Sequence, residues 1–116
     1  MKLFIKFALL AALLSTVYGC ASGTYEARLA PPEAMNPIFL RYKELPDNKV
    51  FVVAVDPTGQ WAFGYDHGRE TLQEAAENAA VKCDKAREKH QVFNKAKLFA
   101  VNNEIVYYNG QDYNKQ

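Results

Sequence analysis

Apolar and polar residues change their spacing several times along the chain, and each pattern predicts an element. Val50–Val55 is apolar on both alternating faces, which predicts a strand buried on both sides. Residues 60–65 alternate large aromatic with small side chains, which predicts a second strand. Between them, Asp56-Pro57-Thr58-Gly59 carries Asp, Pro and Gly where a type I turn prefers them. We therefore expect a β-hairpin.

A capped amphipathic helix is predicted to follow the hairpin. Thr71 and Glu74 have the spacing of a capping box, in which each side chain binds a backbone N–H at the helix start. Since the contact face of this helix contains mainly small residues, three alanines and one cysteine, we expect it to approach the sheet closely and to pack against Trp61 and Phe63. That face repeats every three or four positions and consists of Leu72, Ala76, Ala79, Cys83, Ala86 and His90.

A second hairpin is predicted to close the domain. Residues 97–101 and 104–108 flank Asn102-Asn103, and asparagine tolerates the positive φ of a tight turn. The order β-β-α-β-β indicates an α+β fold, a small domain over residues 47–109 with one amphipathic helix across one face of an antiparallel sheet. A polar tail over residues 110–116 follows it.

One helix can cover only one face of this sheet, although the strand Val50–Val55 is apolar on both. The other face needs a second cover, because a bare apolar patch of several hundred Å² is unusual in a soluble monomer. A short helix over residues 37–45 is one candidate, since Asn36-Pro37 is typical of a helix start and Pro46 would end it. A second protein chain is the other candidate. We favour the helix.

The first 19 residues are predicted to be an export signal. Lys2 and Lys6 precede an apolar run over residues 7–14, which is roughly half the length of about 20 residues that a membrane-spanning helix needs. Small and polar residues follow, as a signal peptidase requires. Residues 20–46 contain Pro31, Pro32 and Pro37 and indicate a tether.

The end of this signal resembles the lipobox of bacterial lipoproteins. The matching residues are Val17-Tyr18-Gly19-Cys20, and the resemblance implies that Cys20 becomes the acylated first residue of a lipid-anchored protein. Ala21 stands where an aspartate would retain a lipoprotein in the inner membrane, which implies the outer membrane, facing the periplasm. An ordinary secretory signal is the alternative, and it would leave Cys20 as a disulfide partner.

Charge and cysteine usage narrow the possible partners. Without Lys2 and Lys6 the chain keeps 12 basic and 13 acidic residues and shows no basic patch, which argues against nucleic-acid binding. If Cys20 is acylated, Cys83 is the only thiol left in an oxidising compartment. We expect it to be buried as a small apolar side chain. A disulfide to another chain and a reactive thiol are the alternatives.

Residues 50–108 resemble a family of exported bacterial proteins known as domain of unknown function 4189. The resemblance lies in the apolar strand, in GQWAFGY over residues 59–65, in EAAENAAVKC over residues 74–83 and in KLFAV over residues 97–101. It implies the fold and an exported location, and it brings no activity. Members often pair the helix cysteine with one near the last strands, whereas residues 94–98 contain none here.

Two groups of side chains are candidates for a binding site. The loop after the second strand holds Asp66, His67, Arg69 and Glu70, whose acidic and histidine side chains could ligate a metal or act as catalysts. Zinc sites need three or four ligands, so we favour a solvated loop. The aromatic row formed by Trp61, Phe63 and Tyr65 could stack on sugars or peptides, but we favour a place in the core.

Catalysis is not expected. The only serines, Ser15 and Ser22, lie in the signal and the tether, and Cys83 and His90 are about 10 Å apart along one helix. We therefore expect no enzyme, and we also expect neither a cofactor nor a metal.

These observations predict a membrane-anchored lipoprotein, attached to the bilayer through Cys20, whose periplasmic domain binds another envelope component, either a protein or the cell wall. Residues Trp61, Tyr65, Asp66, His67 and Arg69 are its candidate surface. A small ligand-binding or hydrolytic module using the loop from Asp66 to Glu70, with Tyr65, is the alternative. The alternative requires the loop side chains to converge on a pocket.

Overall fold

The computed structural model describes residues 29–109 of the chain. The predicted signal, the predicted acylation site Cys20, the beginning of the tether and the tail over residues 110–116 lie outside these residues. Between residues 29 and 109, no helix has the length and apolar character needed to cross a bilayer.

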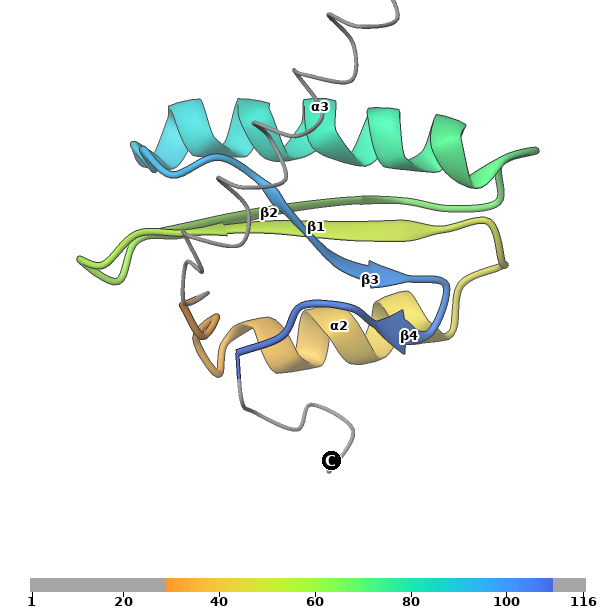
Figure 1. The fold of residues 1–116 in the computed structure, drawn as a ribbon, viewed down its shortest axis with the longest axis horizontal. Coiled ribbons are helices and arrows are strands. Elements are labelled where there is room, and N and C mark those ends of the chain that lie inside the picture. The colour runs from red at the N-terminus through yellow and green to blue at the C-terminus, as the bar shows by residue number, and fades with distance from the viewer. Residues whose placement is uncertain (1–28, 110–116) are drawn as a thin grey trace, which may run out of the picture.

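The domain is an α+β fold, as the sequence predicts. Its sheet is antiparallel and has the strand order β2-β1-β3-β4, so that β2 forms one edge (Figure 1). The strands are β1 (Val50–Val55), β2 (Trp61–Asp66), β3 (Lys97–Val101) and β4 (Glu104–Ile105). Helix α2 (Met35–Lys43) lies on one face of the sheet and helix α3 (Leu72–His90) on the other.

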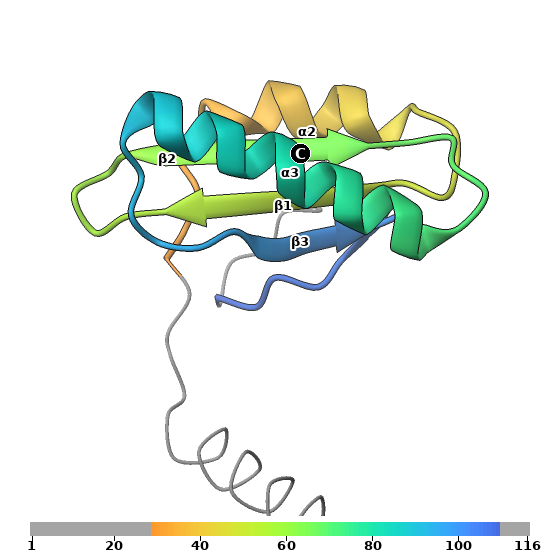
Figure 2. The same cartoon turned by 90° about the horizontal axis from the view of Figure 1, so that it is seen from above.

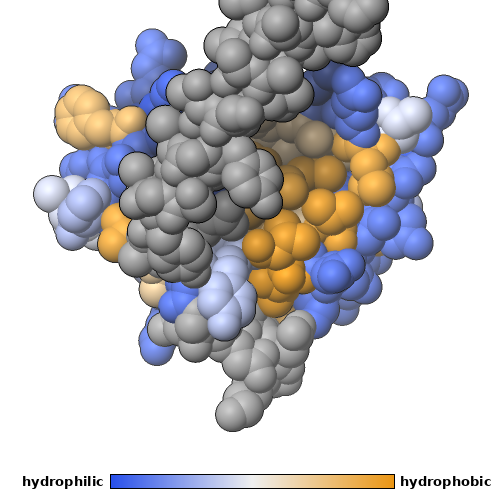
Figure 3. Space-filling view, viewed as in Figure 1, coloured by the Kyte–Doolittle hydropathy of each residue, from blue (hydrophilic) through white to orange (hydrophobic). Residues whose placement is uncertain are grey.

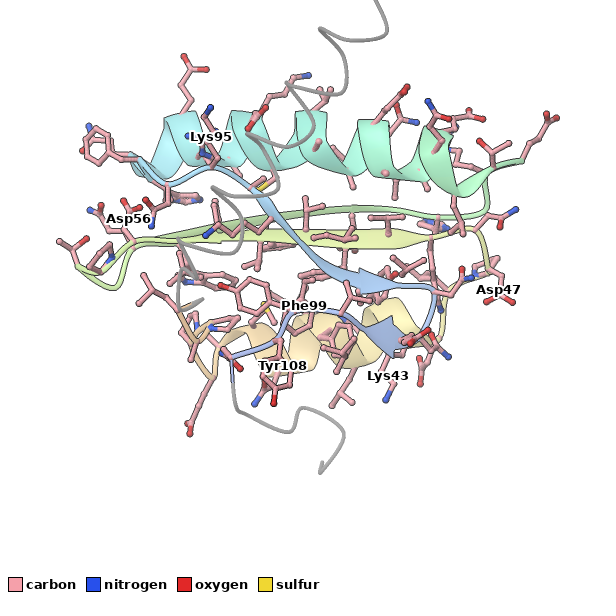
Figure 4. The ribbon with its side chains drawn as sticks, in the orientation of Figure 1. Lys43, Asp47, Asp56, Lys95, Phe99 and Tyr108 are labelled. Carbon is pink, nitrogen blue, oxygen red and sulfur yellow. The ribbon has the colours of Figure 1, made fainter. Side chains whose placement is uncertain are left out.

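The first hairpin has the predicted turn. The Gly59 N–H donates to the carbonyl oxygen of Asp56 at 2.9 Å, and the Asp56 N–H donates to Gln60 at 2.8 Å. The Asp56 carboxylate is buried and accepts the backbone N–H groups of Phe93 and Asn94, both at 2.8 Å (Figure 4). This turn therefore also anchors the segment that joins α3 to β3.

Helix α3 begins as its capping residue predicts. Thr71 is the N-cap, and its Oγ1 accepts the Glu74 N–H at 3.1 Å. The buried stripe differs from the predicted one, because Leu72 is 37% exposed and His90 is also exposed. Leu72 is the first residue of α3 and His90 is the last. The fully buried residues of α3 are Ala75, Ala79 and Cys83.

Each face of β1 contributes to its own core. On the α3 face, Val50, Val52 and Ala54 pack with the small residues of the helix. On the α2 face lie Phe51, Val53 and Val55, which meet a cluster of larger side chains, namely Met35, Phe39, Tyr42, Phe99 and Tyr107. The strand is therefore buried on both sides, as predicted, and the favoured cover by a folded-back helix is confirmed.

The predicted packing of Trp61 and Phe63 against α3 is wrong. Both side chains lie with the core on the α2 face, and Ala62 and Gly64 face α3 instead. Small residues meet small residues because the backbones of β2 and α3 approach closely: a Cβ built on Gly64 would lie 2.5 Å from the Cys83 nitrogen. The aromatic side chains fill the wider space beside α2.

Helix α2 occupies a slightly different segment from the predicted 37–45. It starts at Met35 after a turn in which the Met35 N–H donates to Pro32 at 2.9 Å, so Asn36 lies within the helix and is not its cap. Pro37 fits in this first turn, where an N–H has no intrahelical partner.

A buried lysine caps the other end of α2. The ammonium group of Lys49 donates to the carbonyl oxygens of Tyr42, Lys43 and Leu45 at 3.1, 2.8 and 2.7 Å. Burial lowers the pKa of Lys49, while the carbonyl groups and the negative end of the helix dipole favour its charged form.

The second hairpin turns at Asn102, which has a φ of 51° as predicted for asparagine. Strand β4 is shorter than the predicted 104–108. The N–H groups of Val106 and Tyr107 both donate to Phe99, at 2.9 and 3.2 Å, so the regular ladder ends after Ile105.

Candidate functional site

The predicted polar loop is held by Asp66 at the end of β2. This carboxylate is 2% exposed, and it accepts two hydrogen bonds from Arg69, at 2.6 and 3.2 Å. Asn78 and Lys82 of α3 donate to it at 3.0 and 3.3 Å. The hydrogen bond from Arg69 is the main reason why the pKa of Asp66 lies far below its usual range. Asp66 thus joins β2, the loop and α3.

The rest of the loop does not converge on a pocket. His67 and Glu70 are exposed, and the Arg69 side chain is 42% exposed. Asn48 fixes the loop from the other side, because its amide group donates to the carbonyl oxygens of Arg69 and Glu70 at 2.9 and 3.1 Å. In the part of the chain that the structure describes, no group of three or more acidic, histidine or cysteine side chains could hold a metal ion.

The thiol of Cys83 is fully buried under α3. Burial raises its pKa to about 11, so the thiol stays protonated near neutral pH. The structure therefore agrees with a buried, apolar role, and another chain could reach the sulfur only if α3 moved away.

The aromatic row lies on β2 and is half-buried. Trp61 stacks on Phe63 with centroids 5.5 Å apart, and Phe63 and Tyr65 are 6.2 Å apart and nearly parallel. The row joins the core through Phe51, whose ring stacks on both Phe63 and Tyr65. It is therefore partly core, as favoured, and keeps part of its surface at the edge of the sheet.

Among residues 29–109, no strand pairs with the outer side of β2. In an antiparallel pair, every second residue bonds its partner strand, and the bond from Asp56 to Gln60 sets this alternation. Ala62, Gly64 and Asp66 therefore bond to β1. The N–H and C=O groups of the other three residues point to the free edge, and these residues are Trp61, Phe63 and Tyr65.

A recess of about 310 Å³ lies beside this edge, between β2 and the C-terminal half of α3. It is lined by Gln60, Trp61, Ala62 and Phe63 of the hairpin and by Ala86 and His90 of α3. A larger recess of about 490 Å³ lies on the α2 face, where Val53, Lys95 and Lys97 line it. That larger recess also includes Leu29, the first residue that the structure describes.

A basic row on α3 runs along the same edge. The Lys82 ammonium group donates to the Tyr65 carbonyl oxygen at 3.3 Å, which places this flank of α3 above the outer side of β2. Lys85 and Lys89 follow three and seven positions later, and both are exposed. Residues three, four or seven apart lie on the same side of a helix, so the three lysines share this flank.

An apolar patch marks another side of the domain. Figure 3 shows apolar residues grouped between the two helices, on the side where β3 lies in Figure 1. Seen from above, α3 crosses β1 and β2 and leaves β3 beside it (Figure 2). Leu98 of β3 belongs to the α3 face, opposite Val52, and is 39% exposed.

Comparisons with protein-family models, with curated proteins and with solved structures found no match for this chain. The resemblance to domain of unknown function 4189 therefore stays a prediction.

Proposed function

We propose that this chain is an exported, lipid-anchored binding protein whose folded domain holds another component of the bacterial envelope. The anchor is Cys20, at the end of a signal that resembles a lipobox. The folded part would then face the periplasm from the outer membrane and act by contact, without catalysis.

One observation carries the binding role. The edge strand β2 combines unpaired backbone groups, half-buried aromatic side chains and a neighbouring recess. Long exposed edges are usually protected in monomeric proteins, because they pair readily with other strands. An edge of this kind favours contact with a protein over contact with the cell wall.

The polar loop does not favour the hydrolytic alternative. Asp66, its most buried acid, is occupied by Arg69, Asn78 and Lys82. A general base needs to reach a substrate proton, whereas this carboxylate faces the groups that connect the loop to α3. Of the five predicted surface residues, Trp61 and Tyr65 lie along the free edge and support the proposal best.

Membrane fractionation and in-cell crosslinking test the proposal together. Cys20→Ala should release the protein from the membrane fraction and should abolish its crosslinks to outer-membrane components. Cys83→Ala is the matched control, since it removes the other thiol of the mature chain and should leave both results unchanged. Continued sedimentation of the Cys20→Ala protein with membranes would exclude the lipid anchor. The absence of any crosslinked partner from the wild-type protein would contradict the binding role.

A further inference from the structure

We propose that β2 receives an extended, acidic segment of a partner protein as an additional strand, with apolar side chains over the aromatic row and carboxylates under α3. This inference rests on the proposed binding role and specifies its surface. The backbone of the edge, the recess and the basic row each point to one property of the partner.

The free edge of β2 favours a partner segment with an extended backbone. Trp61, Phe63 and Tyr65 present N–H and C=O groups outward, and a strand that pairs with them gains main-chain hydrogen bonds. The Tyr65 carbonyl oxygen already accepts Lys82, so this contact marks one end of the free edge. The open portion is therefore centred on Phe63.

The two faces of an added strand would meet different surfaces. Side chains of successive residues point to opposite faces of a strand. Those on the α2 face would lie beside the half-buried aromatic row, which favours apolar side chains. Those on the α3 face would enter the recess of about 310 Å³ beside Ala62 and Ala86. The partner should therefore alternate between apolar residues and residues of another kind.

The basic row on α3 indicates that the partner residues on the α3 face are acidic. Lys82 lies beside Tyr65, and His90 lies in the recess with Trp61, so α3 runs antiparallel to β2 along the whole edge. Seven helical residues advance about 10 Å and four strand residues advance about 13 Å. Lys82 and Lys89 therefore flank the two ends of the edge. A glutamate in the recess would lay its methylene groups against the alanines and extend its carboxylate to this row.

The same row disfavours a second copy of this chain. If two β2 strands paired about a twofold axis, both α3 helices would lie on the same face of the joined sheet. The lysines at positions 82, 85 and 89 of the two copies would then face each other, and like charges in that arrangement repel. The basic row thus disfavours pairing between two copies of this chain and favours an acidic partner.

A peptide that alternates valine with glutamate over twelve residues is a direct probe. The full mature protein, purified in detergent, is titrated against this fluorescein-labelled peptide and against a version with lysine in place of glutamate. Fluorescence anisotropy should show at least tenfold weaker binding of the lysine peptide. Equal binding of the two peptides, or no binding of either, would overturn the proposal.

Two pairs of variants locate the site. Phe63→Pro removes the outward N–H and the ring, whereas Phe63→Ala removes only the ring, so the first should weaken binding at least tenfold more than the second. Lys85→Glu with Lys89→Glu should reverse the preference for glutamate, while Lys95→Glu, an exposed residue beside the other recess, should leave it unchanged. The charge reversal keeps the test valid if Phe63→Pro does not fold.

The outcomes also separate this inference from the general binding role. If the glutamate peptide binds Phe63→Pro as well as Phe63→Ala, the attraction is one of charge without strand pairing, and the proposal fails. Envelope crosslinks that persist in cells carrying Lys85→Glu with Lys89→Glu would show a partner on a different surface. In that case the proposed binding role would still hold, but the β2 edge would not be the binding site.

Discussion

Gly64 of β2 lies directly beneath the backbone of Ala79 in α3, so closely that a Cβ on Gly64 would overlap the Ala79 carbonyl oxygen. This contact sets the distance between the sheet and the helix. A side-chain rotation could not relieve this contact, since it involves backbone atoms of both β2 and α3. The absence of a side chain at Gly64 is therefore a condition for the packing of α3.

Gly64→Ala should lower the free energy of unfolding by about 3 kcal/mol, because the added methyl group forces the helix away from the sheet. Gly68→Ala is the matched control. Its nearest neighbour would be 4.0 Å away, and only its positive φ of 65° opposes the change, so it should cost about 1 kcal/mol. Urea denaturation of the two variants measures the difference. Equal costs would mean that α3 does not approach β2 at Gly64.

Asp66 should make the stability of the domain depend on pH in the acid range. The pKa of this carboxyl is lower in the folded protein than in the unfolded chain, mainly because Arg69 donates to it. Such a group contributes stability above its unfolded pKa of about 4, and the contribution is lost as the pH falls toward the folded pKa. The free energy of unfolding should therefore fall steadily below pH 4.

Asp66→Asn tests the origin of this dependence. The substitution removes the charge and should cost about 1 to 3 kcal/mol at pH 7, a range reduced by the partial exposure of Arg69 and Lys82. At pH 3 the gap between the variant and the wild type should become smaller. An unchanged gap between pH 7 and pH 3 would assign the acid dependence to other carboxyl groups.

Lys49 should stabilise the end of α2. Lys49→Met keeps much of the aliphatic stem but removes the donor to three carbonyl oxygens. We expect a loss of about 2 kcal/mol, because the helix end is left with buried acceptors. Lys95→Met makes the same change at an exposed position and should alter stability by less than about 0.5 kcal/mol. Thermal unfolding of both variants provides the measurement. Similar melting temperatures would argue against the cap.

Local patterns predicted most of the elements, because each depends on neighbours in the sequence. The turn at Asp56, the cap at Thr71 and the two-sided strand β1 all follow from residues within a few positions of each other. Local patterns could not predict which helix covers which face of the sheet. Alternation shows that Trp61 and Phe63 share a face, but not whether α2 or α3 covers that face.

The sequence indicated which candidate site residues lie on β2 and in the following loop, but not which of them are buried. Asp66 looked like part of a solvated cluster, although its position at the end of a strand beneath a helix buries it. The free edge was missed because strand order depends on contacts between distant segments, here β1 with β3. The spacing of Lys82, Lys85 and Lys89 is visible in the sequence, but it does not show that these residues lie along the edge of a sheet.

Helix α2 should stabilise the domain because it covers one face of the sheet. Phe39 is 2% exposed and packs edge-to-face against both Phe51 and Phe99, and Figure 4 shows Phe99 on the side of the sheet where α2 lies. Phe39→Ala should cost about 3 to 5 kcal/mol through lost burial and the cavity that remains. A domain of this size has a total stability of roughly 5 kcal/mol, so this variant should partly unfold and aggregate at 37 °C.

Leu40→Ala is the matched control, since the neighbouring side chain is 46% exposed on the same helix. It should change the free energy of unfolding by less than about 0.5 kcal/mol. Urea denaturation and light scattering of the two variants distinguish a loss of cover from a general loss of helix, because α2 keeps its length in both. If Phe39→Ala were as stable and as soluble as Leu40→Ala, α2 would not cover the face formed by Phe51, Val53 and Val55. A second protein chain would then have to cover that face.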